Sequence, residues 1–270
     1  MPVRTFEITS GEPVEMRCAA SLSEASALVP PGAYSTLRTH GGDGVVAFAH
    51  HLRRLEDSAA AQGRPGRLDA VAARTGLAAA VAAAGHAESR VRLTWAPPHL
   101  FAAIEPFEPL PAALYEAGVS CVTVPVRRHD PRTKDTRFLE TARVAYGALP
   151  PETHEGLLVG EDGALLEGLS SNFFAVAAGI LHTEEERALA GITRTLVLEA
   201  ARGVLPLATT ALRLDQLREA TEAFLTSASR GILPVVRVDD VRIGTGRPGP
   251  ITAELRRRFD EIIARETEPL

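Results

Sequence analysis

The sequence predicts a mixed α/β fold with short strands, several of them in hairpins, and amphipathic helices. The first observation is that segments with strand-like alternation and segments with helical spacing follow one another along all 270 residues without a regular strand–helix–strand rhythm. The second is a Pro-rich stretch at 106–111, which is typical of a linker and after which the pattern changes. No G-x-G-x-x-G or P-loop segment opens a helix, so a doubly wound nucleotide-binding sheet is not expected.

The part before the linker combines strands with two helices. Gly41-Gly42-Asp43-Gly44 predicts a hairpin that joins strands at 32–39 and 45–48, because these residues tolerate positive φ. Apolar positions at helical spacing follow, and an Ala-rich run covers 77–84. We expect the remaining strands at 3–8, 14–18, 89–95 and 100–106, and helices over 51–59 and 68–84.

The part after the linker is expected to hold more strands than helices. Glu161-Asp162-Gly163 predicts a hairpin between strands at 156–159 and 164–166. A polar loop at 127–137 contains Lys134. We expect the other strands at 119–126, 172–176, 223–226 and 233–238, and helices over 138–149, 193–202 and 251–265.

Composition excludes several classes of function. The 29 basic and 34 acidic residues give a net charge of −5, which provides no attraction for nucleic acid or anionic membranes. Hydrophobic residues make up 45%, enough for a buried core. Cys18 and Cys121 lie far apart with no CxxC, and the eight histidines show no paired ligand spacing, so we expect neither a disulfide framework nor a metal site. The N-terminus has no apolar signal region and the apolar runs are short, so we expect a cytoplasmic protein outside the membrane.

Lys134 is the single lysine, so the other 28 basic residues are arginines. A bias toward arginine explains most positions. It does not explain the one exception. A guanidinium keeps its proton in proteins and cannot act as an amine nucleophile, whereas a lysine amine can when its pKa is lowered. Lys134 is therefore a candidate for covalent chemistry.

Two further segments fit a site with Lys134. Glu167 ends a predicted strand in Glu167-Gly168-Leu169-Ser170-Ser171-Asn172, and Gly191-Ile192-Thr193-Arg194 opens a predicted helix. A lysine can form a Schiff base, a helix N-terminus can bind phosphate, and a carboxylate can keep a ring nitrogen protonated. Pyridoxal 5′-phosphate requires all three.

With these segments in order, the chain resembles the fold-type IV pyridoxal-phosphate enzymes, or class IV aminotransferases, from about Gly32 to Pro250. The family contains branched-chain aminotransferases, D-amino-acid transaminases and 4-amino-4-deoxychorismate lyases. Its K-x-x-[NR]-[YFL] segment, which carries the Schiff-base lysine, reads Lys134-Asp135-Thr136-Arg137-Phe138 here. Its E-G-x-x-x-N-[IVLF]-F segment, whose carboxylate pairs with the pyridine nitrogen, reads Glu167-Gly168-Leu169-Ser170-Ser171-Asn172-Phe173-Phe174.

The resemblance also implies the residues that bind the cofactor phosphate. The family's H-[LIM]-x-R-L segment reads His51-Leu52-Arg53-Arg54-Leu55, so Arg54 is the implied phosphate arginine. Ile192 and Thr193 belong to the G-I-T-R turn. The second phosphate loop contains Ser227, Ala228 and Ser229, where Ala228 replaces a common hydroxyl and leaves the contact to backbone N–H groups and the two serines.

Substrate residues are harder to identify from the sequence. Tyr34 and Arg38 lie on a strand that faces the substrate in the family, although Tyr34 could equally pack in the core and Arg38 form a salt bridge. Arg92, Arg137 and Arg230 are candidate partners for a substrate carboxylate.

The resemblance implies a two-domain fold like that of D-amino-acid aminotransferase. A small N-terminal α/β domain would cover residues 1–108, a linker 109–117, and a larger C-terminal cofactor-binding domain 118–270, with the cofactor in the cleft and a homodimer as the assembly. The implied reaction is the transfer of an amino group between an amino acid or amine and a 2-oxo acid through Lys134. Two alternatives remain open: 4-amino-4-deoxychorismate cleavage to 4-aminobenzoate and pyruvate, and cofactor binding without turnover.

Overall fold

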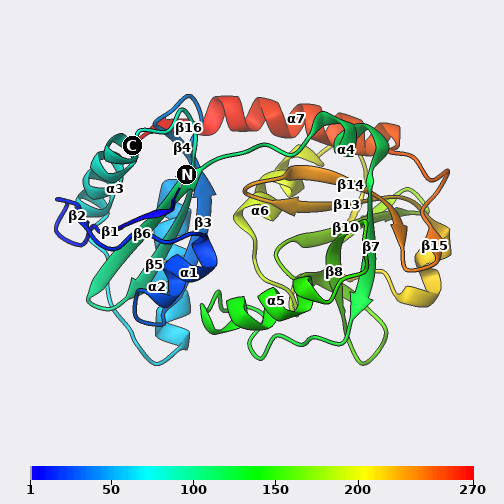
Figure 1. Cartoon of the computed structure of the whole chain (residues 1–270). Helices are drawn as coiled ribbons and strands as arrows, with labels where there is room; N and C mark the ends of the chain where they lie inside the picture. Colours follow the sequence, from blue (N-terminus) through cyan, green and yellow to red (C-terminus); the bar gives the residue numbers. More distant parts are fainter. Residues whose placement is uncertain (1) are drawn as a thin grey trace. The chain divides into compact units, whose positions relative to one another are not determined.

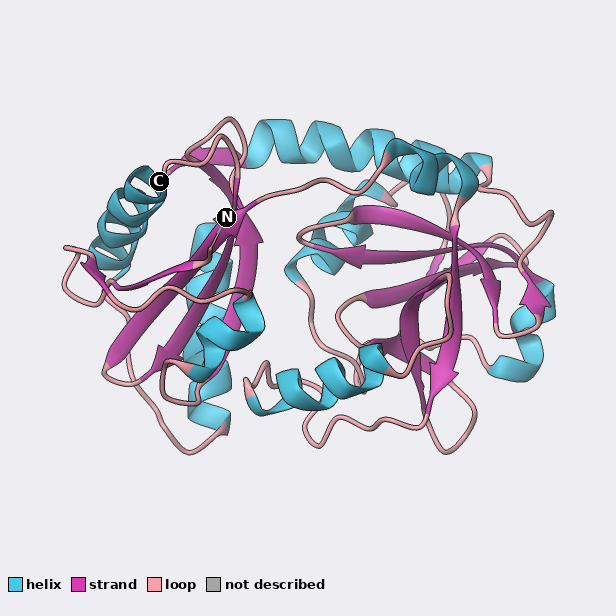
Figure 2. Ribbon diagram, viewed as in Figure 1, coloured by secondary structure: helices cyan, strands magenta, loops and turns pink. Residues whose placement is uncertain are grey.

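The structure is a computed structural model that describes residues 2–270, and the chain divides into two compact units (Figures 1 and 2). Unit 1 comprises the chain up to Glu108 together with Thr133–Glu140 and Arg265–Leu270. Unit 2 comprises Pro109–Arg132 and Thr141–Ala264. The segment that carries Lys134 therefore packs with unit 1. The predicted linker contains a short helix, α4 (Ala112–Ala117).

Unit 1 is built on a five-stranded antiparallel sheet with the order β2-β1-β6-β5-β3. Strands β5 and β6 are connected by a short turn at Pro97-Pro98, and both lie where strands are expected. The strands of this sheet are β1 (Arg4–Glu7), β2 (Val14–Glu15), β3 (Ala33–Arg38), β5 (Ser89–Ala96) and β6 (His99–Pro106).

Helices pack on both faces of this sheet. Successive residues of a strand point to opposite faces, so neighbouring residues of one strand belong to different cores. Ala102 and Ile104 of β6 pack in one core with α2 (Phe48–Ala61) and α3 (Ala70–Ala84), whereas Ala103 packs with α1 (Leu22–Ala27) in another. Helix α3 begins where the Asp69 carboxylate accepts hydrogen bonds from two first-turn N–H groups, and it ends at Gly85, whose φ of 70° suits glycine.

The hairpin predicted around Gly41-Gly42-Asp43-Gly44 is wrong. Strand β4 (Gly44–Val46) pairs with β16 (Thr267–Pro269) near the end of the chain, while β3 pairs with β5. Only an isolated bridge joins His40 to Gly44. A local turn signal therefore identified the turn but not the partner strand.

Unit 2 is built on a nine-stranded sheet, six strands of which close into a barrel with the order β10-β13-β14-β7-β8-β9. Closure depends on one residue pair, Glu167 of β9 opposite Asn172 of β10. The predicted hairpin of β8 and β9 is confirmed. The strands are β7 (Val119–Val124), β8 (Thr153–Val159), β9 (Leu165–Gly168), β10 (Asn172–Ala177), β11 (Ile180–His182), β12 (Leu207–Ala208), β13 (Ala220–Ser227), β14 (Gly231–Val238) and β15 (Val241–Arg242).

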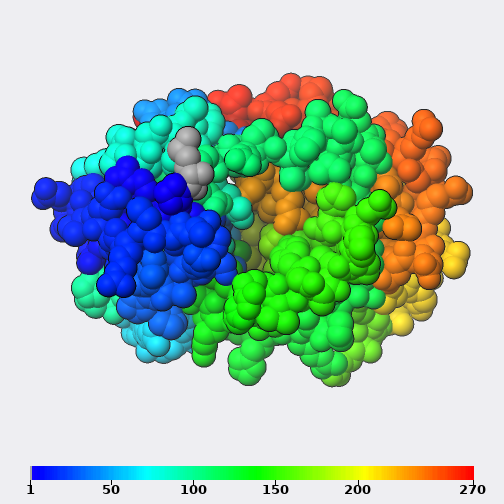
Figure 3. All heavy atoms as spheres, viewed as in Figure 1, coloured from blue at the N-terminus to red at the C-terminus, as the bar shows by residue number. Residues whose placement is uncertain are grey.

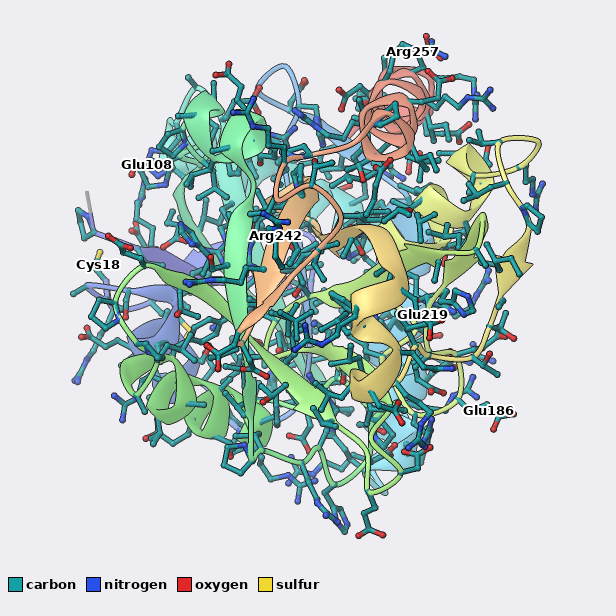
Figure 4. All side chains as sticks on the ribbon, turned by 90° about the vertical axis from the view of Figure 1, so that its right-hand side faces the viewer. Cys18, Glu108, Glu186, Glu219, Arg242 and Arg257 are labelled. Carbon is teal, nitrogen blue, oxygen red and sulfur yellow. The ribbon has the colours of Figure 1, made fainter. Side chains whose placement is uncertain are left out.

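Alternation along the barrel strands separates two cores. Phe173 and Leu225 face the barrel interior, and Phe174 and Phe224 face outward, where their rings stack 4.9 Å apart beneath α6 (Ile192–Ala200) and α7 (Pro250–Glu266). Helix α7 is exposed along its outer side, from which Arg257 points into solvent (Figures 3 and 4). The remaining helices are α5 (Arg137–Gly147), which has residues in both units, and a 3₁₀ turn at Leu214–Glu219.

Neither a membrane-crossing helix nor a metal-binding cluster is found in residues 2–270. None of the helices combines the length and the apolar composition that crossing a bilayer requires. Nor do three or more His, Cys, Asp or Glu side chains in this part of the chain gather where they could hold a metal ion.

Candidate functional site

The segment around Lys134 is attached to β3 of unit 1 by main-chain hydrogen bonds. The Tyr34 N–H donates to the Lys134 carbonyl (2.9 Å), and the Thr136 N–H donates to the Gly32 carbonyl (3.0 Å). Thr136 Oγ1 accepts from the Gly32 N–H in return (3.0 Å), and Ser58 Oγ on α2 accepts from the Lys134 N–H (3.2 Å). The backbone of the single lysine is therefore fixed on both sides, although it lies in a loop.

Two cations of unit 1 lie at the ring of Tyr34, which is buried. The Lys134 Nζ is 4.7 Å from the ring centroid, and the Arg92 Cζ is 5.4 Å from it. Arg54 on α2 is close enough to interact electrostatically with Tyr34. The predicted Schiff-base lysine, the predicted phosphate arginine and two of the predicted substrate residues are thus neighbours within one unit.

Arg54 is a half-buried cation without an anionic partner in the part of the chain that the structure describes. Its Nη2 donates to Ser35 Oγ (2.6 Å), and its buried Nε has no hydrogen-bond partner anywhere in residues 2–270. Burial lowers the pKa of Arg54 to about 10, against a smaller opposite effect of Tyr34. Because burial of an unpaired charge is costly, such a guanidinium is suited to bind an anionic ligand.

His51 of the same helix lies in the same positively charged surroundings. Its ring is buried, and Nδ1 lies 2.6 Å from Ser35 Oγ. Burial first, and then the charges of Arg54 and Lys134, hold the pKa of His51 well below its usual range. The imidazole is therefore neutral near pH 7.

In unit 2, Glu167 is buried at the end of β9, with a side chain that is only 3% exposed. One carboxylate oxygen accepts from Arg128 Nε (2.9 Å) and the other from the Leu189 N–H (3.1 Å). Glu167 and Arg128 both line a pocket of about 450 Å³ on this unit. The pocket has the volume of a small-molecule site, and this buried pair forms part of its wall.

Asn172 connects three of the predicted segments of unit 2. It is paired with Glu167 on β9 and with Thr226 on β13, the residue before the predicted phosphate loop. Its Nδ2 donates to the Leu189 carbonyl (2.8 Å). A Cβ added at Gly191 would lie 2.1 Å from Asn172 Oδ1, so the glycine of the G-I-T-R turn permits this close approach.

The predicted phosphate-binding segments lie at a helix N-terminus and at a hairpin turn. Helix α6 begins at Ile192 with Gly191 as its N-cap, so Ile192 and Thr193 occupy the first turn, where backbone N–H groups lack intrahelical partners. Ser227, Ala228 and Ser229 form the half-buried turn between β13 and β14, which is closed where the Arg230 N–H donates to the Ser227 carbonyl (3.2 Å).

Arg230, a predicted substrate residue, forms a buried ion pair. Its Nη1 donates to Glu155 Oε2 (2.8 Å), and its Nη2 donates to Ser170 Oγ (2.6 Å). Tyr146 and Ser171 also donate to the Glu155 carboxylate (2.5 and 2.9 Å). Burial alone would lower the pKa of Arg230, but Glu155 and Tyr146 raise it above its ordinary value. In this arrangement the charge of Arg230 is already compensated.

The remaining predicted arginines differ in exposure. Arg38 lies over the ring of Phe107, 4.4 Å from its centroid. Arg137 is 74% exposed and forms an ion pair with Asp135 (2.5 Å). Arg92 is buried, and its Nη1 donates to two acceptors on α1 at 2.8 Å each.

Three residues that the sequence analysis did not identify contact the predicted ones: Ser35, Arg128 and Glu155. Alternation along β3 places Ser35 on the same side as apolar Ala33 and Leu37, so a polar residue at an apolar position could have drawn attention to it. Glu155 precedes an apolar run and carries a weaker signal of the same kind. Nothing in the sequence distinguishes Arg128 from its neighbour Arg127.

Comparison with known proteins gives consistent results. A family described as amino-transferase class IV matches residues 32–238. A branched-chain-amino-acid aminotransferase of Pseudomonas aeruginosa is 28% identical over 57% of this chain and 52% of its own length, and a D-alanine aminotransferase of Bacillus licheniformis is 31% identical over 50% and 48%. The chain thus spans about half the length of the curated relatives it matches. The solved branched-chain aminotransferase from Thermoproteus uzoniensis with norvaline shares the fold, with a TM-score of 0.79, 23% identity and coverage of 100% and 99%.

Proposed function

Because the chain belongs to the class IV aminotransferase family, we propose that it is a pyridoxal-phosphate-dependent aminotransferase. It would move an amino group between an amino acid or amine and a 2-oxo acid. The observation that carries the proposal is in unit 1, where the N–H of the single lysine donates to Ser58 of α2, the helix whose Arg54 has no anionic partner among residues 2–270. An amine for covalent attachment and a cation for a phosphate are two of the three features that this cofactor requires.

The residues of both units fit the cofactor. The buried Nε of Arg54 lacks a partner and could donate to a phosphate oxygen. In unit 2, Ile192, Thr193 and the turn from Ser227 to Ser229 could supply backbone N–H groups and hydroxyls to a phosphate.

When bound, the cofactor supplies an electron sink that accepts the electrons left on Cα of the amino substrate when its C–H bond breaks. Glu167 would lie against the ring nitrogen and favour its protonated form, since an opposite charge at hydrogen-bonding distance stabilises a cation. Lys134 Nζ would attach the cofactor in the resting protein, and as a free amine it would take the proton from Cα and deliver it to the cofactor rather than back to Cα. Asn172 would keep Glu167 and the start of α6 in register, because it contacts both segments.

Tyr34, Arg38, Arg92, Arg137 and Arg230 remain candidates for substrate contact. Tyr34 and Arg92 are favoured by their position next to Lys134. Arg230 is less favoured, because Glu155 already neutralises it. The substrates would be small amino and keto compounds, and we propose a cytoplasmic homodimer, as in the family.

The test begins with the cofactor. Borohydride reduction of the yellow protein, followed by peptide mass analysis, should place the cofactor on Lys134, and Lys134→Arg should lose both the label and turnover. Arg54→Ala should weaken cofactor binding by roughly 1.5–3 kcal/mol, the value of a hydrogen bond to a charged group. Labelling in Lys134→Arg equal to that of the unmodified chain would contradict the proposal.

The reaction is decided by a substrate panel. Purified protein is incubated with paired amino and 2-oxo acids of both stereochemical series, and in parallel with 4-amino-4-deoxychorismate. New amino acid from the pairs supports amino transfer. Release of 4-aminobenzoate and pyruvate instead would identify the lyase, and a labelled protein inactive with every substrate would be a cofactor-binding relative.

A further inference from the structure

We propose that Ser35 and His51 are positioning residues that hold the Arg54 guanidinium in place for the phosphate of pyridoxal 5′-phosphate. The contact runs from Arg54 through the Ser35 hydroxyl to the His51 ring, all within unit 1. The inference rests on the proposed function, because it takes the cofactor phosphate as the anion of Arg54.

The direction of the two hydrogen bonds follows from the chemistry of the groups. A guanidinium can only donate, so Ser35 Oγ accepts from Arg54 Nη2 (2.6 Å). The single hydroxyl proton of Ser35 is then available for His51 Nδ1, which lies 2.6 Å away. This arrangement makes Nδ1 an acceptor and places the imidazole proton on Nε2.

The surroundings of His51 keep it in the neutral form that this arrangement needs. Burial and the charges of Arg54 and Lys134 lower its pKa well below the usual range. Protonation would turn Nδ1 into a donor and add a second positive charge beside Arg54. The positive charges that attract an anion therefore also keep His51 Nδ1 unprotonated, so that it can accept the Ser35 hydrogen bond.

The geometry of α2 and β3 explains why these three side chains meet. His51 and Arg54 are three residues apart and so lie on one face of the helix, which packs against β3. Ser35 is fully buried on the side of β3 that faces the helix. Arginine has many rotamers, and one hydrogen bond at Nη2 restricts them while Nε stays without a protein partner. A preorganised donor binds an anion with a smaller entropic cost.

The experiment compares two forms of the cofactor that differ only in the phosphate. Dissociation constants for pyridoxal 5′-phosphate and pyridoxal are measured by absorbance titration of the full chain after removal of bound cofactor. Ser35→Ala should weaken the binding of pyridoxal 5′-phosphate roughly tenfold and leave that of pyridoxal unchanged. Ser35→Thr, which keeps a hydroxyl, should restore the preference for the phosphorylated form. His51→Leu should behave like Ser35→Ala, since it removes the acceptor.

Ser89→Ala is the matched control. Ser89 is also a fully buried serine on the same sheet, and its hydroxyl has no hydrogen-bond partner among the described residues. The Ser89→Ala variant should bind pyridoxal 5′-phosphate and pyridoxal as tightly as the unmodified chain does.

Three other results would overturn part of the reasoning. Equal weakening of both cofactor forms in Ser35→Ala would indicate a general structural role and refute the positioning role. Ser35→Ala could instead keep the preference for pyridoxal 5′-phosphate over pyridoxal while Arg54→Ala loses it. That result would refute the inference and leave the proposed function intact. If the unmodified chain does not prefer pyridoxal 5′-phosphate to pyridoxal, the phosphate site itself is wrong.

Discussion

The ion pair of Arg230 and Glu155 should be necessary for the stability of unit 2. Glu155 has a side chain with no exposed surface, and Arg230 is 19% exposed. Removal of one partner of a buried ion pair costs about 3–5 kcal/mol, because the other charge stays buried and unpaired. Arg230→Met keeps the length of the side chain and removes its charge. Tyr146 and Ser171 would still donate to Glu155, so we expect a loss near the lower limit, about 3 kcal/mol.

The loss can be measured by urea unfolding followed by circular dichroism. With a denaturant slope of about 2 kcal/mol per molar, the expected loss lowers the midpoint by about 1.5 M. Glu155→Leu combined with Arg230→Met should recover much of it, because no buried charge remains. Arg257→Met is the control. Arg257 pairs with Glu254 and Glu261 on the solvent side of α7, where ion pairs add little, so its midpoint should not change (Figure 4).

The same variant also distinguishes two roles of Arg230. If Arg230 binds the substrate carboxylate, Arg230→Met should raise KM without changing the unfolding midpoint. A midpoint in Arg230→Met equal to that of Arg257→Met would refute the argument from burial. A double variant less stable than Arg230→Met alone would refute the assignment of the loss to an uncompensated Glu155.

Three further predictions can be checked independently. Glu167→Gln should leave the cofactor bound and lower kcat sharply in turnover assays, because the lost charge matters most in the transition state; an unchanged kcat would mean that the ring's partner is elsewhere. Burial, together with the charge of Glu155, raises the pKa of the Cys121 thiol, whereas Cys18 is exposed, so a thiol reagent should modify Cys18 alone until the chain unfolds (Figure 4). Burial lowers the pKa of His40 to about 4 and that of His51 well below 6.5, so the unfolded chain binds protons at these histidines more tightly than the folded chain does. The urea midpoint of unfolding should therefore fall as the pH decreases from 6.5 toward 4. A higher midpoint at pH 5 than at pH 6.5 would contradict this.

The sequence alone was sufficient for most elements and for the family. Alternation and helical spacing are local properties, so they located α2, α3, the hairpin of β8 and β9 and the helix at the end of the chain within a few residues. The absence of any other lysine, together with the segments around it, made Lys134 the predicted attachment residue, because only a lysine amine can attach the cofactor. The ordered segments then matched one family, because each retains residue types that a specific chemistry requires.

Tertiary structure decided which segments pair and which charges are compensated. The turn at Gly41-Gly42-Asp43-Gly44 could not reveal that β4 pairs with β16 near the other end of the chain, because strand pairing depends on long-range packing. Nor could the sequence distinguish Arg230, neutralised by a buried Glu155, from Arg54, which has no anionic partner within residues 2–270. Both are arginines in a family motif or next to one. Their difference is set by what lies within a few ångströms in space, and electrostatic energy depends on that distance and on burial rather than on position in the chain.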